Sequence, residues 1–235
     1  MDGPAWLMVR AADVPLSDDW LSGRERQVLS QHRLPRRHAD WRLGRWAAKQ
    51  AILATRDEPD GVCLDELEIL AAADGSPKAW FRGTPADITV SISHRDGGAV
   101  ALVCRADTLA GCDVELIEPR APVFVTDWFT PTEREAVERA PAPSRDLLVT
   151  MIWSAKESAL KAIRQGLRLD TRDIEVELSD EEGEGWRRFA ASWSGKSLAG
   201  WSRQEGRWVV TTVIDRASRP PLSVDGFGNA KERFR

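Results

Sequence analysis

The chain has 235 residues, of which 42% are hydrophobic and 30% charged, and its formal net charge is −4. These proportions are typical of a globular protein and exclude a disordered chain. No apolar run approaches the roughly 20 residues of a membrane helix, and the first residues lack a signal-peptide pattern. The three cysteines, without CxxC spacing, indicate neither a disulfide framework nor a zinc cluster. We therefore expect a cytoplasmic protein that does not bind membranes.

Positive charge is concentrated in the first quarter of the chain. Between residues 24 and 49, eight lysines and arginines are opposed by only two acidic residues, Glu25 and Asp40. Such a local excess on an acidic chain favours an anionic partner, such as a phosphate, a nucleotide or an acidic protein. The alternative is an ordinary solvated helix face. Because no base-reading motif accompanies the charge, we do not expect a nucleic acid partner.

In chain order, the first clear element is a helix over residues 37–53, where small and apolar side chains recur at helical spacing. Residues 74–77 have the composition of a turn. The alternation of apolar and polar residues over 88–92 predicts a half-buried strand, which ends at Ser93 and His94.

A second helix start lies further along the chain. Thr130 has the side chain of an N-cap, Pro131 suits the first helical position, and Glu133 completes a capping box. Beyond residue 217, two adjacent prolines and two late glycines predict a loose tail.

An internal repeat organises the chain. Residues 46–53 (WAAKQAIL) recur as residues 153–160 (WSAKESAL) at an offset of 107, with four of eight positions identical. At the same offset, 67–69 match 174–176, which predicts a strand after each helix. Another apolar strand follows in each half, over 99–103 and 208–213.

The repeat predicts an α+β protein made of two similar halves related by a pseudo-twofold axis, with the active site at their interface. We place the N-terminal half at residues 1–110, the C-terminal half at 111–216 and the loose tail at 217–235.

Two carboxylates lie on one short segment, Gly111-Cys-Asp-Val-Glu115. On a strand, Asp113 and Glu115 point to the same face. Two such oxygen donors suit Mg²⁺, which often bridges carboxylates to substrate phosphates. The alternative is a pair of ordinary acidic residues on an exposed strand.

The second segment is Trp153-Ser-Ala-Lys-Glu-Ser-Ala-Leu-Lys161, in which Glu157 and Lys161 share one helix face. By itself this spacing also describes a helix-stabilising ion pair. Ser93 and His94 could likewise be a polar turn, and no third residue completes a hydrolase triad.

Five motifs in order resemble the 4′-phosphopantetheinyl transferase superfamily, in its large monomeric, surfactin-synthetase-activating type. The resemblance covers about residues 24 to 215. The motifs are Gly75-Ser-Pro77, Ser91-Ile-Ser-His94, Gly111-Cys-Asp-Val-Glu115, Phe129-Thr-Pro-Thr-Glu133 and Trp153 to Lys161. The upstream Gly44-Arg45, with Arg36-Arg37, is similar to the family's coenzyme A-contacting helix.

The resemblance implies a role for each matching residue. Asp113, Glu115 and Glu157 match Mg²⁺ ligands, and Lys161 matches the lysine near the pyrophosphate. Residues expected at coenzyme A are Arg36 or Arg37 at the 3′-phosphate, with Arg45, Ser93 and His94. Many members have Gly-Lys-Pro where this chain has Gly-Ser-Pro, and Lys78 is the candidate substitute for that lysine.

The expected activity is Mg²⁺-dependent transfer of 4′-phosphopantetheine from coenzyme A to a serine of an apo acyl or peptidyl carrier protein, with release of 3′,5′-ADP. Glu157 and Lys161 are the expected catalytic residues, and the protein is expected to be a monomer. Two alternatives stay open: another Mg²⁺-dependent phosphodiester-cleaving enzyme, and a non-catalytic module that binds coenzyme A or a carrier protein.

Overall fold

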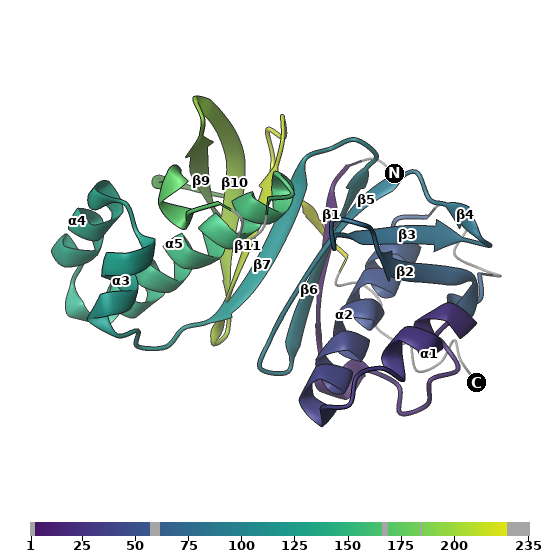
Figure 1. Ribbon diagram of the computed structural model, residues 1–235. Helices are drawn as coiled ribbons and strands as arrows, with labels where there is room; N and C mark the ends of the chain where they lie inside the picture. Colours follow the sequence, from purple (N-terminus) through teal and green to yellow (C-terminus); the bar gives the residue numbers. More distant parts are fainter. Residues whose placement is uncertain (1–2, 57–61, 166–168, 184, 225–235) are drawn as a thin grey trace. The chain divides into compact units, whose positions relative to one another are not determined.

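The computed structural model describes residues 3–56, 62–165, 169–183 and 185–224. These residues form a mixed α+β structure, which confirms the predicted fold class. The chain divides into two compact units (Figure 1): unit 1 comprises residues 1–92, 97–107 and 221–235, and unit 2 comprises 93–96 and 108–220. The sequence boundary at residue 110 therefore lies near the third crossing between the units, between residues 107 and 108, but residues 93–96 group with unit 2.

Unit 1 is built on a four-stranded sheet in the order β12-β1-β6-β5. Its strands are β1 (Ala5–Arg10), β5 (Ile88–Arg95), β6 (Gly98–Arg105) and β12 (Leu222–Ser223). The first seven residues of β6 are buried, because helix α2 packs against this strand and against β1. Leu222 and Ser223, expected in a loose tail, instead pair with Ala5 and Trp6.

Helix α2 (Pro35–Ala54) is the main helix of unit 1 and includes the predicted helix at residues 37–53. Pro35 fits its first turn, where the missing N–H costs nothing. Small buried residues, among them Gly44, Ala47 and Ala51, let the sheet approach closely. The other elements are η1 (Ala11–Asp13), α1 (Gly23–Leu29), η2 (Leu64–Glu66) and a small sheet of β2 (Leu67–Ala71), β3 (Pro77–Phe81) and β4 (Thr84–Pro85).

Unit 2 is built on a five-stranded sheet in the order β7-β11-β10-β9-β8. The strands are β7 (Ala110–Leu116), β8 (Ile174–Gly183), β9 (Trp186–Trp193), β10 (Lys196–Glu205) and β11 (Trp208–Ile214). All pairings in this sheet are antiparallel, and Asp113 on β7 lies opposite Thr211 on β11.

Helix α5 (Ala142–Ala162) crosses β7 and β11 in Figure 1 and buries a face of small and apolar side chains against them. Before it come α3 (Pro122–Trp128) and α4 (Pro131–Arg139), and after it η4 (Thr171–Asp173). The predicted capping box at Thr130 and Glu133 is present at the start of α4. Within the described residues, no helix is both long and apolar enough to span a membrane.

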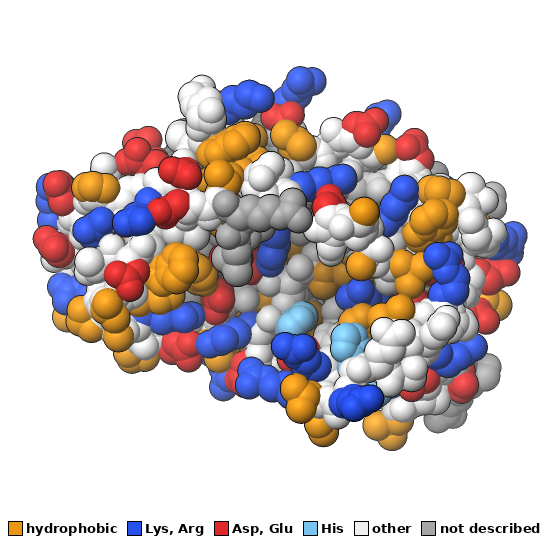
Figure 2. All heavy atoms as spheres, viewed as in Figure 1, with side chains coloured by type: hydrophobic (Ala, Val, Ile, Leu, Met, Phe, Trp, Pro, Cys, Tyr) orange, Lys and Arg blue, Asp and Glu red, His pale blue; other side chains and the backbone are white. Residues whose placement is uncertain are grey.

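Charged and hydrophobic side chains are mixed on the surface of both units. Over α3 and α4, Figure 2 shows hydrophobic groups among acidic and basic ones, and Val123 and Trp128 are 60% and 39% exposed. In unit 1, lysine and arginine side chains are visible over α1 and α2.

Candidate active site

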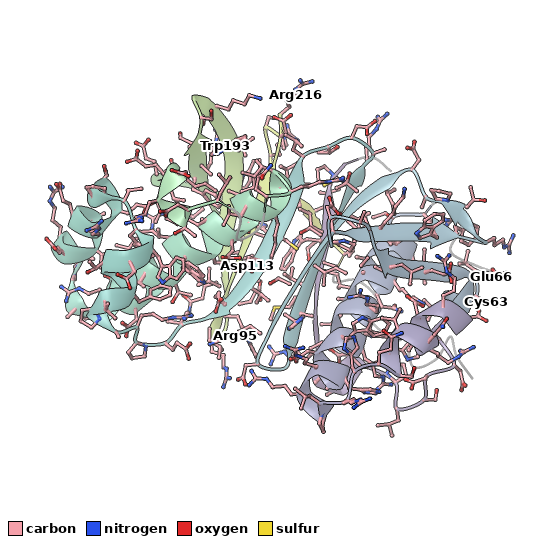
Figure 3. The ribbon with its side chains drawn as sticks, in the orientation of Figure 1. Cys63, Glu66, Arg95, Asp113, Trp193 and Arg216 are labelled. Carbon is pink, nitrogen blue, oxygen red and sulfur yellow. The ribbon has the colours of Figure 1, made fainter. Side chains whose placement is uncertain are left out.

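Asp113 is the centre of the candidate site, on the face of β7 that helix α5 crosses (Figure 3). The pleat of the strand places Glu115 on the same face, as the spacing predicts. The helix can come this close because residue 111 is a glycine. A Cβ atom there would lie 2.1 Å from the Ser158 carbonyl oxygen and 2.6 Å from the Ala162 nitrogen.

One carboxylate oxygen of Asp113 accepts two hydrogen bonds. Ser93 Oγ donates to Oδ1 across 2.7 Å, and Lys161 Nζ donates to the same atom across 2.8 Å. Lys161 Nζ also donates to the carbonyl oxygen of Cys112 across 3.1 Å. The end of β5 and the end of α5 therefore meet at one buried carboxylate.

Lys161 is held in its charged form at this position. Burial is the largest single influence and would lower the pKa, but Asp113, Cys112 and Glu157 together outweigh it, so the pKa of Lys161 is raised. The Lys161 side chain keeps 30% of its surface exposed, whereas Asp113 keeps 6%. A protonated amine thus extends from a buried carboxylate towards solvent, where it can meet an anion.

Glu115 accepts hydrogen bonds from Trp153 and Arg120 and forms an ion pair with Arg95. Trp153 Nε1 donates to Oε1 across 3.2 Å, while Arg120 Nη2 and Arg95 Nε lie 3.1 Å and 3.5 Å from Oε2. Burial and the nearby charge of Asp113 raise the pKa of Glu115, although Arg120 and Arg95 oppose this shift. Burial is therefore the main reason why the charged form of Glu115 is disfavoured, and the like charge of Asp113 adds to it.

Glu157 shows the same two effects more strongly. Burial, and then the charge of Asp113, raise its pKa to about 7, with Glu115 adding to the shift and Lys161 opposing it. No hydrogen bond within the described part of the chain satisfies this carboxylate. A partly buried acid with such a pKa can take up or release a proton near neutral pH.

The three carboxylates have the chemistry of a magnesium site. Their hard oxygen atoms are the donors that Mg²⁺ prefers, and their mutual repulsion would be relieved by a cation. Among the described residues, no group of three or more His, Cys, Asp and Glu side chains is already arranged to hold an ion. The set of Asp113, Glu115 and Glu157 is thus suited to a divalent cation in donor type and charge.

The other predicted coenzyme A residues are divided between the units. His94 is exposed and lies in unit 2, one residue beyond Ser93. Arg36 and Arg37 are exposed at the start of α2, and Lys78 is exposed on β3 with its amine 5.2 Å from the Trp80 ring. All three belong to unit 1.

Arg45 differs from the other predicted basic residues because it is largely enclosed. Its guanidinium lies 4.5 Å from the centre of the Trp41 ring, and Nε donates to the Ile69 carbonyl oxygen across 3.3 Å. Burial lowers its pKa to about 10, against the opposing charge of Glu25. Part of its bonding capacity is thus already used within unit 1.

A cavity of about 640 Å³ in unit 2 lies away from this chemistry, between α4, α5 and β8. None of the predicted site residues lines it; its walls include Leu148, Met151 and Leu178.

The structure also identifies residues that the sequence did not single out. Ser154 Oγ donates to Asp113 Oδ2 across 2.9 Å and contacts Thr211 Oγ1, also at 2.9 Å. Two signals could have found them. Ser154 and Ser158 are spaced by four residues on a helix, and Thr211 is one of two adjacent polar residues in a strand that is apolar elsewhere.

The segment that carries these residues has known relatives. Residues 110–213 match the family model of the 4′-phosphopantetheinyl transferase superfamily. The matched segment runs from β7 to β11 and contains Asp113, Glu115, Glu157 and Lys161, so it supports the superfamily for this part of the chain. Ser93, His94 and nearly all of unit 1 lie outside it.

One curated relative and two solved structures similar to this chain are all named holo-acyl-carrier-protein synthases. A holo-[acyl-carrier-protein] synthase of Thermodesulfovibrio yellowstonii is 36% identical over 59 residues, which are 25% of this chain and 52% of that protein. The chain thus spans about half the length of this relative.

The solved structures are holo-acyl-carrier-protein synthases of Bacillus anthracis and Thermotoga maritima. The first, in complex with CoA (3′,5′-ADP), is 23% identical with a TM-score of 0.38 and covers 45% of this chain and 96% of its own. The second is 22% identical with a TM-score of 0.36 and covers 53% of this chain and 72% of its own.

Proposed function

We propose that this protein transfers 4′-phosphopantetheine from coenzyme A to a serine of an apo acyl or peptidyl carrier protein in the cytoplasm. The proposal rests on the cluster around Asp113. Protonated Lys161 and Ser93 donate hydrogen bonds to Asp113, and the charges of Glu115 and Glu157 interact with it. The superfamily match to residues 110–213 includes this cluster apart from Ser93. Anion-binding and cation-binding groups in one place suit the transfer of a phosphoryl-linked group.

Asp113, Glu115 and Glu157 would hold Mg²⁺. Bound there, the ion would neutralise the pyrophosphate of coenzyme A and orient its phosphates for displacement. Lys161, which stays protonated beside Asp113, would contact the same pyrophosphate, with Ser93 and His94 at its phosphate oxygens. In unit 1, Arg45 and Lys78 would contribute to coenzyme A binding, and Arg36 or Arg37 would contact its 3′-phosphate.

The transfer itself exchanges one P–O bond for another. The carrier serine oxygen attacks the β-phosphorus of coenzyme A, and the bond from that phosphorus to the bridging oxygen breaks, which releases 3′,5′-ADP. The serine proton would pass to Glu157, which acts as the general base in addition to its place among the Mg²⁺ ligands. Lys161 stabilises the negative charge that develops on the bridging oxygen.

The large monomeric type fits the organisation of the chain. Each unit contains a helix, α2 or α5, that packs on two antiparallel strands, and both helices carry the repeated Trp-x-x-Lys segment. One chain therefore supplies two related units, as expected for a protein that acts as a monomer.

The carrier protein is expected to be acidic around its serine. The basic side chains of α1 and α2 would steer it electrostatically, so the association rate should fall as salt increases. Stopped-flow association at several salt concentrations measures this, and a salt-independent rate would argue against steering.

Intact-mass spectrometry of a panel of apo carrier proteins, incubated with the protein, coenzyme A and Mg²⁺, tests the proposal. We expect one phosphopantetheine arm on the carrier serine, and none in the presence of a chelator. Glu157→Gln should abolish the gain, whereas Glu175→Gln, which changes an exposed glutamate on β8, should leave it intact. Coenzyme A binding without transfer to any carrier would instead favour a binding module.

A further inference from the structure

Three buried hydroxyl groups form a chain that ends at Asp113. Ser154 Oγ bonds to Asp113 Oδ2 at 2.9 Å, Thr211 Oγ1 lies 2.9 Å from Ser154 Oγ, and Ser158 Oγ lies 2.6 Å from Thr211 Oγ1. All three hydroxyl-bearing residues have 0% of their surface exposed. The oxygen they reach is not the one that accepts from Ser93 and Lys161.

The direction of the hydrogen bonds follows from proton counting. A carboxylate only accepts, so Ser154 must use its single proton on Asp113. Thr211 has one proton for three acceptors, which are Ser154 Oγ at 2.9 Å, the Ser154 carbonyl oxygen at 2.8 Å and Ser158 Oγ at 2.6 Å. Ser158 donates to Thr211, at Oγ1 or at the carbonyl oxygen 3.1 Å away. The link that reaches the carboxylate itself is therefore the hydrogen bond from Ser154, and the other two hydroxyls hold Ser154 in place.

Unit 1 shows that the fold does not need these hydroxyls. The repeat offset of 107 relates α5 to α2 and β7 to β1, and Leu102 pairs with Trp6 as Thr211 pairs with Asp113. The four corresponding positions are apolar in unit 1 and polar in unit 2. They are Trp6 for Asp113, Ala47 for Ser154, Ala51 for Ser158 and Leu102 for Thr211. The unit 1 residues are all 0% exposed, so a buried apolar set satisfies the same packing. The buried hydroxyl groups are therefore present in the unit that has the buried carboxylate, Asp113, and absent from the corresponding positions of the other unit.

We infer that Ser154 and Thr211, with Ser158 behind them, are positioning residues that fix the Asp113 carboxylate for a divalent cation. This inference rests on the proposed function for the metal role of Asp113. A hydrogen bond to Oδ2 restrains rotation of the carboxylate, so less freedom is lost when the cation binds. Groups that orient a metal ligand in this way typically change metal affinity by about 10- to 100-fold.

The test is binding of Mn²⁺ to the free protein, measured by electron paramagnetic resonance without coenzyme A. Ser154→Ala should weaken binding by at least about tenfold, and Thr211→Val by roughly threefold or more, because it acts one link further away. Thr211→Ser, which keeps the hydroxyl, should bind within about twofold of the original protein.

Thr212→Val is the matched control. Thr212 is the next residue of β11, is also 0% exposed, and its hydroxyl has no hydrogen-bond partner within the described structure. Its replacement should leave Mn²⁺ binding unchanged. If Thr211→Val does not fold, Ser154→Ala and Ser158→Ala carry the test, since each removes only one oxygen atom.

Mn²⁺ affinity in Ser154→Ala and Thr211→Val equal to that of Thr212→Val would overturn the inference, even if both variants were less stable. An unaltered protein that binds no Mn²⁺ would overturn it as well. The mass-spectrometric transfer assay then reports separately whether the proposed function holds, because it measures the product on the carrier protein.

Discussion

Lys156 Nζ lies 2.9 Å from the Glu133 carboxylate, and their side chains are 0% and 1% exposed. The repeat places the same relationship in unit 1, where Lys49 lies 2.6 Å from Glu25 and both are 0% exposed. Each glutamate also closes a helix capping box and accepts a backbone N–H from the first strand after the helix, at Val176 in unit 2 and Ile69 in unit 1. The lysine of the repeated segment therefore has a structural role in both units.

Replacement of Lys156 by Met should destabilise the protein strongly. Glu133 would keep its buried position without a cationic partner, and breaking such a pair typically costs about 3–5 kcal/mol. Urea denaturation followed by circular dichroism measures the change. Arg139→Ala, which breaks the exposed ion pair with Glu135 on α4, is the control and should change stability by less than about 1 kcal/mol. A similar small loss in Lys156→Met would contradict the structural role.

Gly111→Ala should damage both stability and transfer. The added methyl group would collide with the backbone of α5 at residues 158 and 162, and overpacking of this kind typically costs about 1–3 kcal/mol. Because the helix carries Glu157 and Lys161, its displacement should also lower the transfer rate. The measurements are urea denaturation and the mass-spectrometric assay.

Gly23→Ala provides the matched control for that variant. Gly23 begins α1, and a Cβ atom there would meet nothing within 4 Å. Alanine is the better helix former, so we expect unchanged or slightly higher stability and full activity. An equal loss in both variants would show that the close approach at Gly111 is unimportant.

Glu157→Gln should stabilise the metal-free protein while it abolishes transfer. The pKa of Glu157 is raised to about 7 in the folded protein, so ionisation of this carboxyl costs folding free energy. That cost is absent below the unfolded-state pKa of about 4.5 and grows until pH 7. The melting temperature of the variant should thus match that of the original protein near pH 4 and exceed it at pH 8. A lower melting temperature at pH 8 would indicate that Glu157 is stabilised by contacts rather than strained by its charge.

Lys161→Ala should reduce the rate of transfer by about 10²–10³, as expected for loss of one electrostatic contact to the transition state. Single-turnover kinetics with saturating coenzyme A isolate this step. Lys196→Ala, which changes an exposed lysine on β10, should retain the full rate. Comparable rates in the two variants would remove Lys161 from the mechanism.

Local patterns predicted several features of the local structure correctly. The alternation at residues 111–115 placed Asp113 and Glu115 on one strand face, and the capping box at Thr130 and Glu133 marked the start of a helix. Both depend on neighbours within a few residues, so the chain itself contains the information.

Interactions between distant residues were not predictable in the same way. Lys156 reads as a polar helix position, and only the fold shows that it is buried beside Glu133. Thr211 is 98 residues from Asp113 in the sequence, and only their pairing in the sheet brings the Thr211 hydroxyl close to the carboxylate. The parallel pairing of Leu222 with Ala5 was missed because a two-residue strand has no periodicity to detect.

That short pairing has a consequence for how the protein is made. β1 lies between β6 and β12 in its sheet, and residues 108–220, which make up all of unit 2 except 93–96, come between β6 and β12 in the chain. During synthesis β1 therefore keeps one open hydrogen-bonding edge until residues 222 and 223 emerge, after every strand of unit 2 has been made. Unit 2 has all its segments available first, and the earliest strand is the last to gain both its neighbours.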